Sequence, residues 1–127
     1  MLNSIDIPKT ADTPKVALDP QNDYFEIAGK SLPEDVQKFY DPIKQWIEEY
    51  VKQPNASTVF EFKLEYCNSA SERQIVQLIA LLEKIIEMGK EVKIIWYYKN
   101  VHGLMQDSGE GIKSAVDIPF EIKRISP

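Results

Sequence analysis

The feature that most constrains the fold is an alternating segment followed by a polar turn and an amphipathic segment, over residues 60–88. Residues 60–66, FEFKLEY, alternate apolar and charged side chains, which is typical of a strand with one buried face. After the turn at residues 67–71, apolar residues recur every three or four positions from Ile75 to Ile86. This spacing predicts a helix with one face against a sheet, ended by Gly89.

A second strand is predicted directly after this helix. Residues 91–97 become apolar on both faces in their later half, which is typical of a central position in a covered sheet. Because strand, helix and strand follow one another over residues 60–97, the two strands are expected to be parallel with a right-handed crossover. The predicted fold class is therefore α/β, with helices covering the sheet.

The N-terminal part is expected to add a β-hairpin, which makes the predicted sheet mixed. Short apolar runs at residues 16–18 and 24–27 flank a segment rich in turn residues, and Gly29 is expected to close the second strand. Residues 1–14 are polar and aperiodic. They are expected to form a flexible or edge-lying arm of a single domain that spans residues 1–127.

Capping signals predict a helix after the hairpin. Ser31 with Glu34 forms a capping box, and Asp41 before Pro42 is expected to cap a restart, because proline breaks the hydrogen-bond pattern of a helix. Residues 100–114 contain three glycines and are expected to form a loop with at most a short helix. The chain is predicted to end in a strand whose Pro119 places it at an edge or at a strand start.

The turn before the main helix contains two competing capping boxes. Ser71 pairs with Gln74 and Ser69 pairs with Glu72, and the spacing does not choose between them. If Ser71 is the cap, Ser69 lies beside exposed helix N–H groups, where a phosphate group would be stabilised by the helix dipole. The alternative is that both serines are ordinary turn and cap residues.

Composition excludes several classes of function. A net charge of −5 without a basic stripe argues against nucleic acid as a partner. One cysteine and one histidine are too few for a usual zinc site, so neither a metal nor a cofactor is expected. Neither a secretion signal nor a membrane-spanning segment is visible, and we expect a cytoplasmic protein.

One pattern suggests an enzyme. Cys67 and Arg73 are separated by five residues between a strand and a helix, which is the C-x5-R arrangement of thiol phosphatases. However, Ala70 replaces the glycine usual in such loops, and Glu72 would place negative charge in the anion site. His102 has no partner in a recognisable catalytic motif. A small thiol phosphatase therefore remains as an alternative function, and no catalytic residue is assigned.

The order of several short motifs resembles the SiaC family of bacterial regulatory phosphoproteins, over nearly the whole chain. That family is in turn similar to the STAS domains of anti-sigma-factor antagonists. The motifs are TPKV at 13–16, GKSLPE at 29–34, FYDPI at 39–43 with Trp46, YCNSAS at 66–71, WYY at 96–98 and IPF at 118–120.

The resemblance implies a phosphorylation site in the turn before the main helix. The family's Asn-Ser/Thr pair falls on Asn68 and Ser69, so Ser69 is the expected phosphosite and Ser71 the second candidate. The residues expected to contact a partner are Asn68, Ser69, Ala70, Ser71 and Arg73. In this interpretation the protein is a non-enzymatic switch, and a monomer when free.

The resemblance also implies the partners. Unphosphorylated, such a protein binds and activates a diguanylate cyclase, which makes cyclic di-GMP. A dedicated anti-sigma-like kinase phosphorylates it, and a PP2C-type phosphatase reverses the modification. An alternative is a STAS-type antagonist that sequesters the kinase and has no cyclase partner. The chain departs from the family at residues 99–103, KNVHG, where an acidic run is usual, and this departure bears on which partner is bound.

Overall fold

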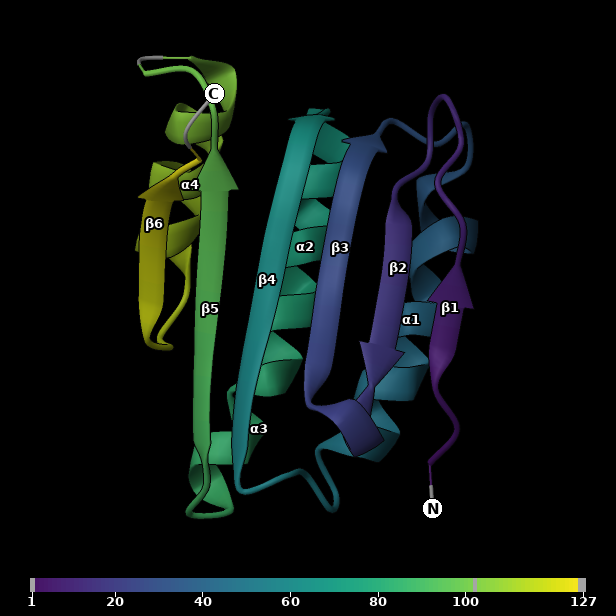
Figure 1. Cartoon of the computed structure of the whole chain (residues 1–127), viewed down its shortest axis with the longest axis vertical. Coiled ribbons are helices and arrows are strands. Elements are labelled where there is room, and N and C mark those ends of the chain that lie inside the picture. Colours follow the sequence, from purple (N-terminus) through teal and green to yellow (C-terminus); the bar gives the residue numbers. More distant parts are fainter. Residues whose placement is uncertain (1, 102, 126–127) are drawn as a thin grey trace.

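Figure 1 shows the computed structural model, which describes residues 2–101 and 103–125. Six strands form one sheet in the order β1-β2-β3-β4-β5-β6, and the helices lie behind it in this view. The strands are β1 (Ile5–Ile7), β2 (Lys15–Asp19), β3 (Tyr24–Ser31), β4 (Ser57–Cys67), β5 (Glu91–Tyr98) and β6 (Phe120–Arg124). The helices are the 3-10 turn η1 (Pro20–Asn22), α1 (Val36–Tyr50), α2 (Ser69–Leu82), α3 (Lys84–Glu87) and α4 (Leu104–Ala115).

The sheet is mixed. Strands β1, β2 and β3 are antiparallel, and β3 to β6 run parallel to one another. This arrangement confirms the predicted hairpin, formed by β2 and β3, and the predicted parallel crossover from β4 to β5. Strand β6 begins directly after Pro119 at one edge of the sheet, as expected. Within residues 1–14, β1 pairs with β2 at the opposite edge.

Helices cover only one face of the sheet. On that face the rings of Phe25, Phe60, Phe62 and Trp96 form a continuous stacked row with centroid separations of 5.1 to 6.2 Å. The other face is open and polar, with ion pairs between the strands. Strand β5 is an internal strand, as expected, and Ile94, Ile95 and Trp96 in its later half are all buried. The expectation that helices cover both of its faces was wrong.

Helix α1 differs from its predicted start and continuity. Ser31 is still part of β3, and Asp35 caps the helix in its place. The helix then passes through Pro42 without a restart, so Asp41 is not a cap. Proline removes one backbone hydrogen bond of the helix. Buried side chains before and after Pro42 nevertheless hold the helix against the sheet. The buried side chains of α1 are Tyr40, Ile43, Trp46, Ile47 and Tyr50.

The structure differs from the predicted elements at three further places, two of which involve a glycine. Gly29 has a φ of 112° beside a register shift, so β3 continues past it instead of ending. The predicted helix is divided into α2 and α3, and Gly89 follows α3 with a φ of 76°, as its predicted role requires. Residues 104–115 form a full helix where a loop with at most a short helix was expected. Gly109 lets this helix lie against Trp96, because a Cβ there would sit 2.5 Å from the indole ring.

Candidate functional site

The turn between β4 and α2 is capped by Asn68 and by neither serine. The Asn68 side-chain oxygen accepts a hydrogen bond from the Ser71 backbone N–H at 2.9 Å. The Asn68 backbone N–H donates to the Ser31 carbonyl at 3.1 Å, which fixes the end of β4 to the end of β3. The expectation that Ser69 or Ser71 would be the cap was therefore wrong. Asn and Ser cap helices about equally well, so residue type alone does not choose between them.

Ser71 points into the protein and has no exposed surface. Its hydroxyl donates to the Ser31 carbonyl at 2.9 Å and accepts from the Ser31 hydroxyl at 2.8 Å. The Tyr40 hydroxyl lies 2.6 Å from the Ser31 hydroxyl, and burial raises the pKa of Tyr40 to about 12. This hydroxyl network therefore joins β3, α1 and α2 at a position that neither a kinase nor a partner can contact directly.

Ser69 is the first residue of α2 and is exposed. In the part of the chain that the structure describes, no hydrogen bond is recorded for its hydroxyl. Arg73 is also exposed and lies four residues further on, so the two side chains share one face of the helix. Ala70, between the two serines, is half-buried. The outer side of this turn thus combines a free hydroxyl, the positive end of the helix dipole and a guanidinium group.

The surroundings of Cys67 do not fit a thiol phosphatase. Cys67 is only 4% exposed, and burial, with a smaller contribution from the carboxylate of Glu72, raises the pKa of its thiol to about 12. The Glu72 carboxylate lies 3.9 Å from the sulfur and also accepts a hydrogen bond from the Ser108 hydroxyl of α4. A nucleophilic cysteine needs a lowered pKa. This site therefore holds a neutral thiol, and Arg73 is directed to solvent.

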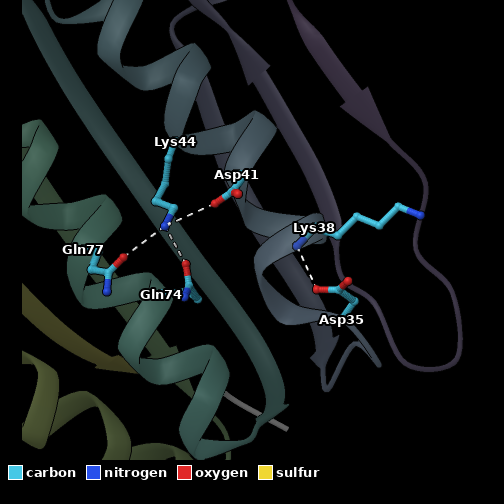
Figure 2. Close-up of polar contacts among 6 residues, drawn as sticks. All are labelled: Asp35, Lys38, Asp41, Lys44, Gln74 and Gln77. Carbon is cyan, nitrogen blue, oxygen red and sulfur yellow. Dashed lines mark hydrogen bonds and ion pairs between the residues drawn. The ribbon is translucent and has the colours of Figure 1, made fainter.

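Helix α2 is also fixed along its length by a polar bridge to α1. Figure 2 shows Lys44 of α1 reaching Gln74 and Gln77 of α2, with Nζ to Oε1 distances of 2.7 and 3.0 Å. The same ammonium group lies 3.5 Å from the Asp41 carboxylate, so Asp41 has an ion-pairing role instead of the predicted capping role. Together with the Ser31 network, this bridge holds the first turn of α2 in place.

Exposed apolar side chains surround the same end of the sheet. The carboxyl ends of β3, β4 and β5 lie at the upper end in Figure 1, where α4 begins. Leu32 follows β3, Tyr66 is near the end of β4, and Leu104 begins α4; their exposed fractions are 38%, 38% and 69%. We call these three residues the apolar rim. Single exposed apolar residues are common on protein surfaces, so the apolar rim indicates an interaction surface only together with the turn at the same end of the sheet.

Sequence reasoning missed the Ser31 and Tyr40 hydroxyls and the apolar rim. No local signal identifies Ser31, because its partner Ser71 is 40 positions away in the chain. His102 lies outside the described residues. Within residues 2–101 and 103–125, no group of three or more His, Cys, Asp or Glu side chains could hold a metal ion. Over the same ranges, every helix is too short or too polar to cross a membrane.

Comparisons with known proteins agree with this geometry. A crystal structure of apo-SiaC from Pseudomonas aeruginosa has a TM-score of 0.84 and 23% identity, covering 95% of this chain and 98% of that one. The fold also matches a chain in the crystal structure of the diguanylate cyclase SiaD in complex with its activator SiaC, from the same organism. That match has a TM-score of 0.85 and 23% identity, over 95% of this chain and 99% of that one.

A sequence relative and a family model extend the match. An uncharacterized protein of Pseudomonas aeruginosa (strain UCBPP-PA14) is 23% identical over 122 residues, which is 96% of this chain and 97% of the relative. The family model described as "SiaC family regulatory phosphoprotein" matches residues 7–125. This match confirms the resemblance and the expected fold class. The chain belongs to the SiaC family of regulatory phosphoproteins.

Proposed function

We propose that this chain is a non-enzymatic, cytoplasmic switch protein that binds and activates a diguanylate cyclase until Ser69 is phosphorylated. A cognate anti-sigma-like Ser/Thr kinase adds the phosphate and a PP2C-type phosphatase removes it. Family membership supports the regulatory role, and the solved complex in which SiaC is the activator of SiaD supports a cyclase as the partner. The observation that carries the choice of site is the contrast between the exposed Ser69 and the fully buried Ser71.

The first turn of α2 can hold a phosphate without refolding. A phosphate on Ser69 adds about −1.5 to −2 charge at neutral pH. It would lie at the positive end of α2, with Arg73 four residues away on the same helix face. Arg73 would then bind the phosphate oxygens as a counterion within the same helix, because a guanidinium can bind phosphate in a bidentate manner.

The same phosphate would repel an apolar or acidic partner surface. Ser69 and Arg73 are exposed on this turn, at the end of the sheet that carries the apolar rim. A partner that docks on the turn itself would cover the phosphate. Burying a charge that has no partner across an interface is strongly unfavourable. Phosphorylation would then release the partner by changing one local charge, and the domain would keep its fold.

The experiment compares the chain carrying phosphoserine at position 69, incorporated during translation, with unmodified protein and Ser69→Ala. Each protein is used as bait in lysate of the source organism and then in a cyclic di-GMP synthesis assay with the captured cyclase. We expect the unmodified protein and Ser69→Ala to capture and activate the cyclase. The phosphorylated protein should bind it about tenfold less tightly or worse, a difference of about 1.4 kcal/mol or more.

Two outcomes would contradict the proposal. Equal capture and activation by all three proteins would show that Ser69 does not control the partner. Capture of a kinase alone, without any cyclase, would favour the antagonist that sequesters its kinase. Adding Arg73→Ala to the phosphorylated protein tests the internal counterion: its unfolding free energy should fall by more than that of unmodified Arg73→Ala.

A further inference from the structure

Strands β4 and β5 separate before they end. Their pairing register stops at Phe62 and Trp96, but β4 continues to Cys67 and β5 to Tyr98. Figure 1 shows the upper parts of the two strands diverging. Within the described residues, no strand is paired with this side of β4 after Phe62. The segment Lys63–Tyr66 therefore has an edge that no described strand pairs with, bordered by the start of α4. Its pairing with β3 skips Glu65, opposite the register shift between Gly29 and Lys30.

Each strand is held in the diverged position by its outer neighbour. Strand β4 remains paired with β3 as far as Ser31 and Cys67. Strand β5 remains paired with β6 as far as Tyr98 and Arg124, and the Ile125 N–H donates to the Tyr98 carbonyl at 2.7 Å. The separation is thus part of the folded sheet and does not result from fraying of either strand.

The separation borders a cavity of about 880 Å³, which extends across the open face of the sheet to Ala28 and Gly29 of β3. Residues 63–66 of β4 line one wall and residues 97–100 line the other, while residues 103–105 at the start of α4 also border it. We call this cavity the β4–β5 cleft. A volume in this range is typical of binding sites. The cleft joins an unpaired strand edge to the apolar rim, because Tyr66 and Leu104 belong to both.

The cleft is positively charged although the chain carries a net charge of −5. Four lysines line it, at positions 9, 15, 63 and 99, against a single lining carboxylate, that of Glu65. Lys15 and Lys63 share the carboxylate of Glu26, at 3.5 and 3.1 Å, and Lys9 lies 3.7 Å from Glu65. The Glu61 carboxylate also attracts Lys63 and accepts a hydrogen bond from the Tyr97 hydroxyl at 2.7 Å. Four ammonium groups thus face three carboxylates. No ion pair is recorded for Lys99 among the described residues, which leaves positive charge available at this wall.

We propose that the β4–β5 cleft binds an extended acidic segment of a partner protein, which adds its backbone to the open edge of β4. Strand addition satisfies those backbone groups of residues 63–66 that point away from β3, and the lysines supply the preference for acidic side chains. A small anion would use the lysines alone and leave the strand edge unpaired. This site is separate from the phosphorylated turn, because neither Ser69 nor Arg73 lines the cleft.

The test is an NMR titration of the ¹⁵N-labelled full chain in 150 mM salt. The probe is a blocked hexapeptide of alternating Glu and Val. We expect saturable shifts of the amide signals of residues 63–66 and 97–100, together with slower hydrogen exchange in β4. The same peptide methylated on its backbone nitrogens keeps its charge but cannot pair as a strand, and it should bind at least tenfold more weakly. A hexapeptide of alternating Lys and Val should not bind.

Matched charge reversals locate the binding site. Lys99→Glu should weaken binding of the Glu-Val peptide severalfold. Lys38→Glu should not, because Lys38 lies on α1 and its side chain extends away from its neighbours (Figure 2). Ser69→Asp should leave peptide affinity unchanged, which keeps this test independent of the phosphorylation switch.

Three results would overturn the proposal. Equal binding of the methylated peptide would show an anion site without strand addition. Equal losses in Lys99→Glu and Lys38→Glu would show non-specific attraction. An absence of saturable shifts at millimolar peptide would show that the cleft does not bind acidic segments.

Discussion

The two serines in the first turn of α2 lie two residues apart and have opposite environments. Ser71 is completely buried and donates to the Ser31 carbonyl, within a network that includes Tyr40. Ser69 lies on the solvent side of the same turn. The buried Ser71 hydroxyl therefore stabilises the fold, and the exposed Ser69 hydroxyl is accessible to an enzyme. A charge can be added on one side of the turn without disturbing the packing on the other.

The largest expected effect comes from placing a charge on the inner side. Ser71→Asp puts a carboxylate among the buried hydroxyls of Ser31 and Tyr40, and it should lower the free energy of unfolding by about 3–5 kcal/mol. Urea denaturation followed by circular dichroism measures this loss. Ser69→Asp is the matched control on the outer side. A similar loss in both variants would show that the two sides of the turn do not differ.

The thiol on the inner side should make stability fall at high pH. Burial raises the pKa of Cys67 from an ordinary value of 9.0 to about 12, so the folded state keeps a proton that the unfolded state loses. The stabilisation is fully present below pH 9 and is lost as the pH rises toward 12. The loss is at most about 1.4 kcal/mol per pH unit. Tyr40 behaves in the same way above pH 10.

Denaturation at pH 8, 9 and 10 tests this dependence. Between pH 9 and 10 the Cys67→Ala variant should lose less unfolding free energy than the wild type, because it lacks the thiol. Identical slopes would mean that the thiol ionises in the folded state as it does in solution. That result would support the alternative in which Cys67 is a reactive thiol.

Because Asn68 is the helix cap, its replacement should cost more unfolding free energy than replacement of Ser69. Asn68→Ala removes the side-chain acceptor of the Ser71 N–H and should cost about 1 kcal/mol of unfolding free energy. Ser69→Ala changes an exposed residue and should stay within about 0.5 kcal/mol of the wild type. Chemical denaturation of both variants measures the difference. A larger cost for Ser69→Ala would make Ser69 the cap.

The smallest expected effect is a gain on the outer side. Ser69→Asp places negative charge at the positive end of α2 and should raise the unfolding free energy by about 0.3–1 kcal/mol at low salt. The gain should disappear in 1 M salt, where the charge is screened. Thermal unfolding at both salt concentrations measures it. A loss of stability would indicate that the neighbouring Glu65 and Glu72 outweigh the dipole.

Local patterns predicted the strands and the main helix well. Strand β4 and helix α2 form where they were expected. Each has one buried face, which the alternation at residues 60–66 and the spacing from Ile75 onward predicted. The motif order predicted the family. Helix α4 was expected to be at most a short helix within a loop, because its glycines resemble a loop, but Gly109 instead lets the helix lie against the Trp96 ring.

Features that depend on distant residues were not predictable. The two predicted caps, Ser69 and Ser71, look alike in the sequence, and the cap is neither of them but Asn68. Strand β3 places the Ser31 carbonyl beside Asn68 and Ser71, which decides the arrangement of the turn. The β4–β5 cleft likewise arises from pairing with outer strands, which no local pattern records. The sequence thus pointed to the turn as a candidate site, and only the fold shows that Ser69 faces outward and Ser71 inward.

The most direct test of the account is to locate the phosphate. The chain is incubated with ATP and its cognate kinase, and the product is fragmented by tandem mass spectrometry. We predict one phosphate, on Ser69, and none on the Ser69→Ala variant. Phosphate on Ser71, or a Ser69→Ala variant modified to the same extent as the wild type, would contradict the central claim that only the outer hydroxyl of this turn controls the protein.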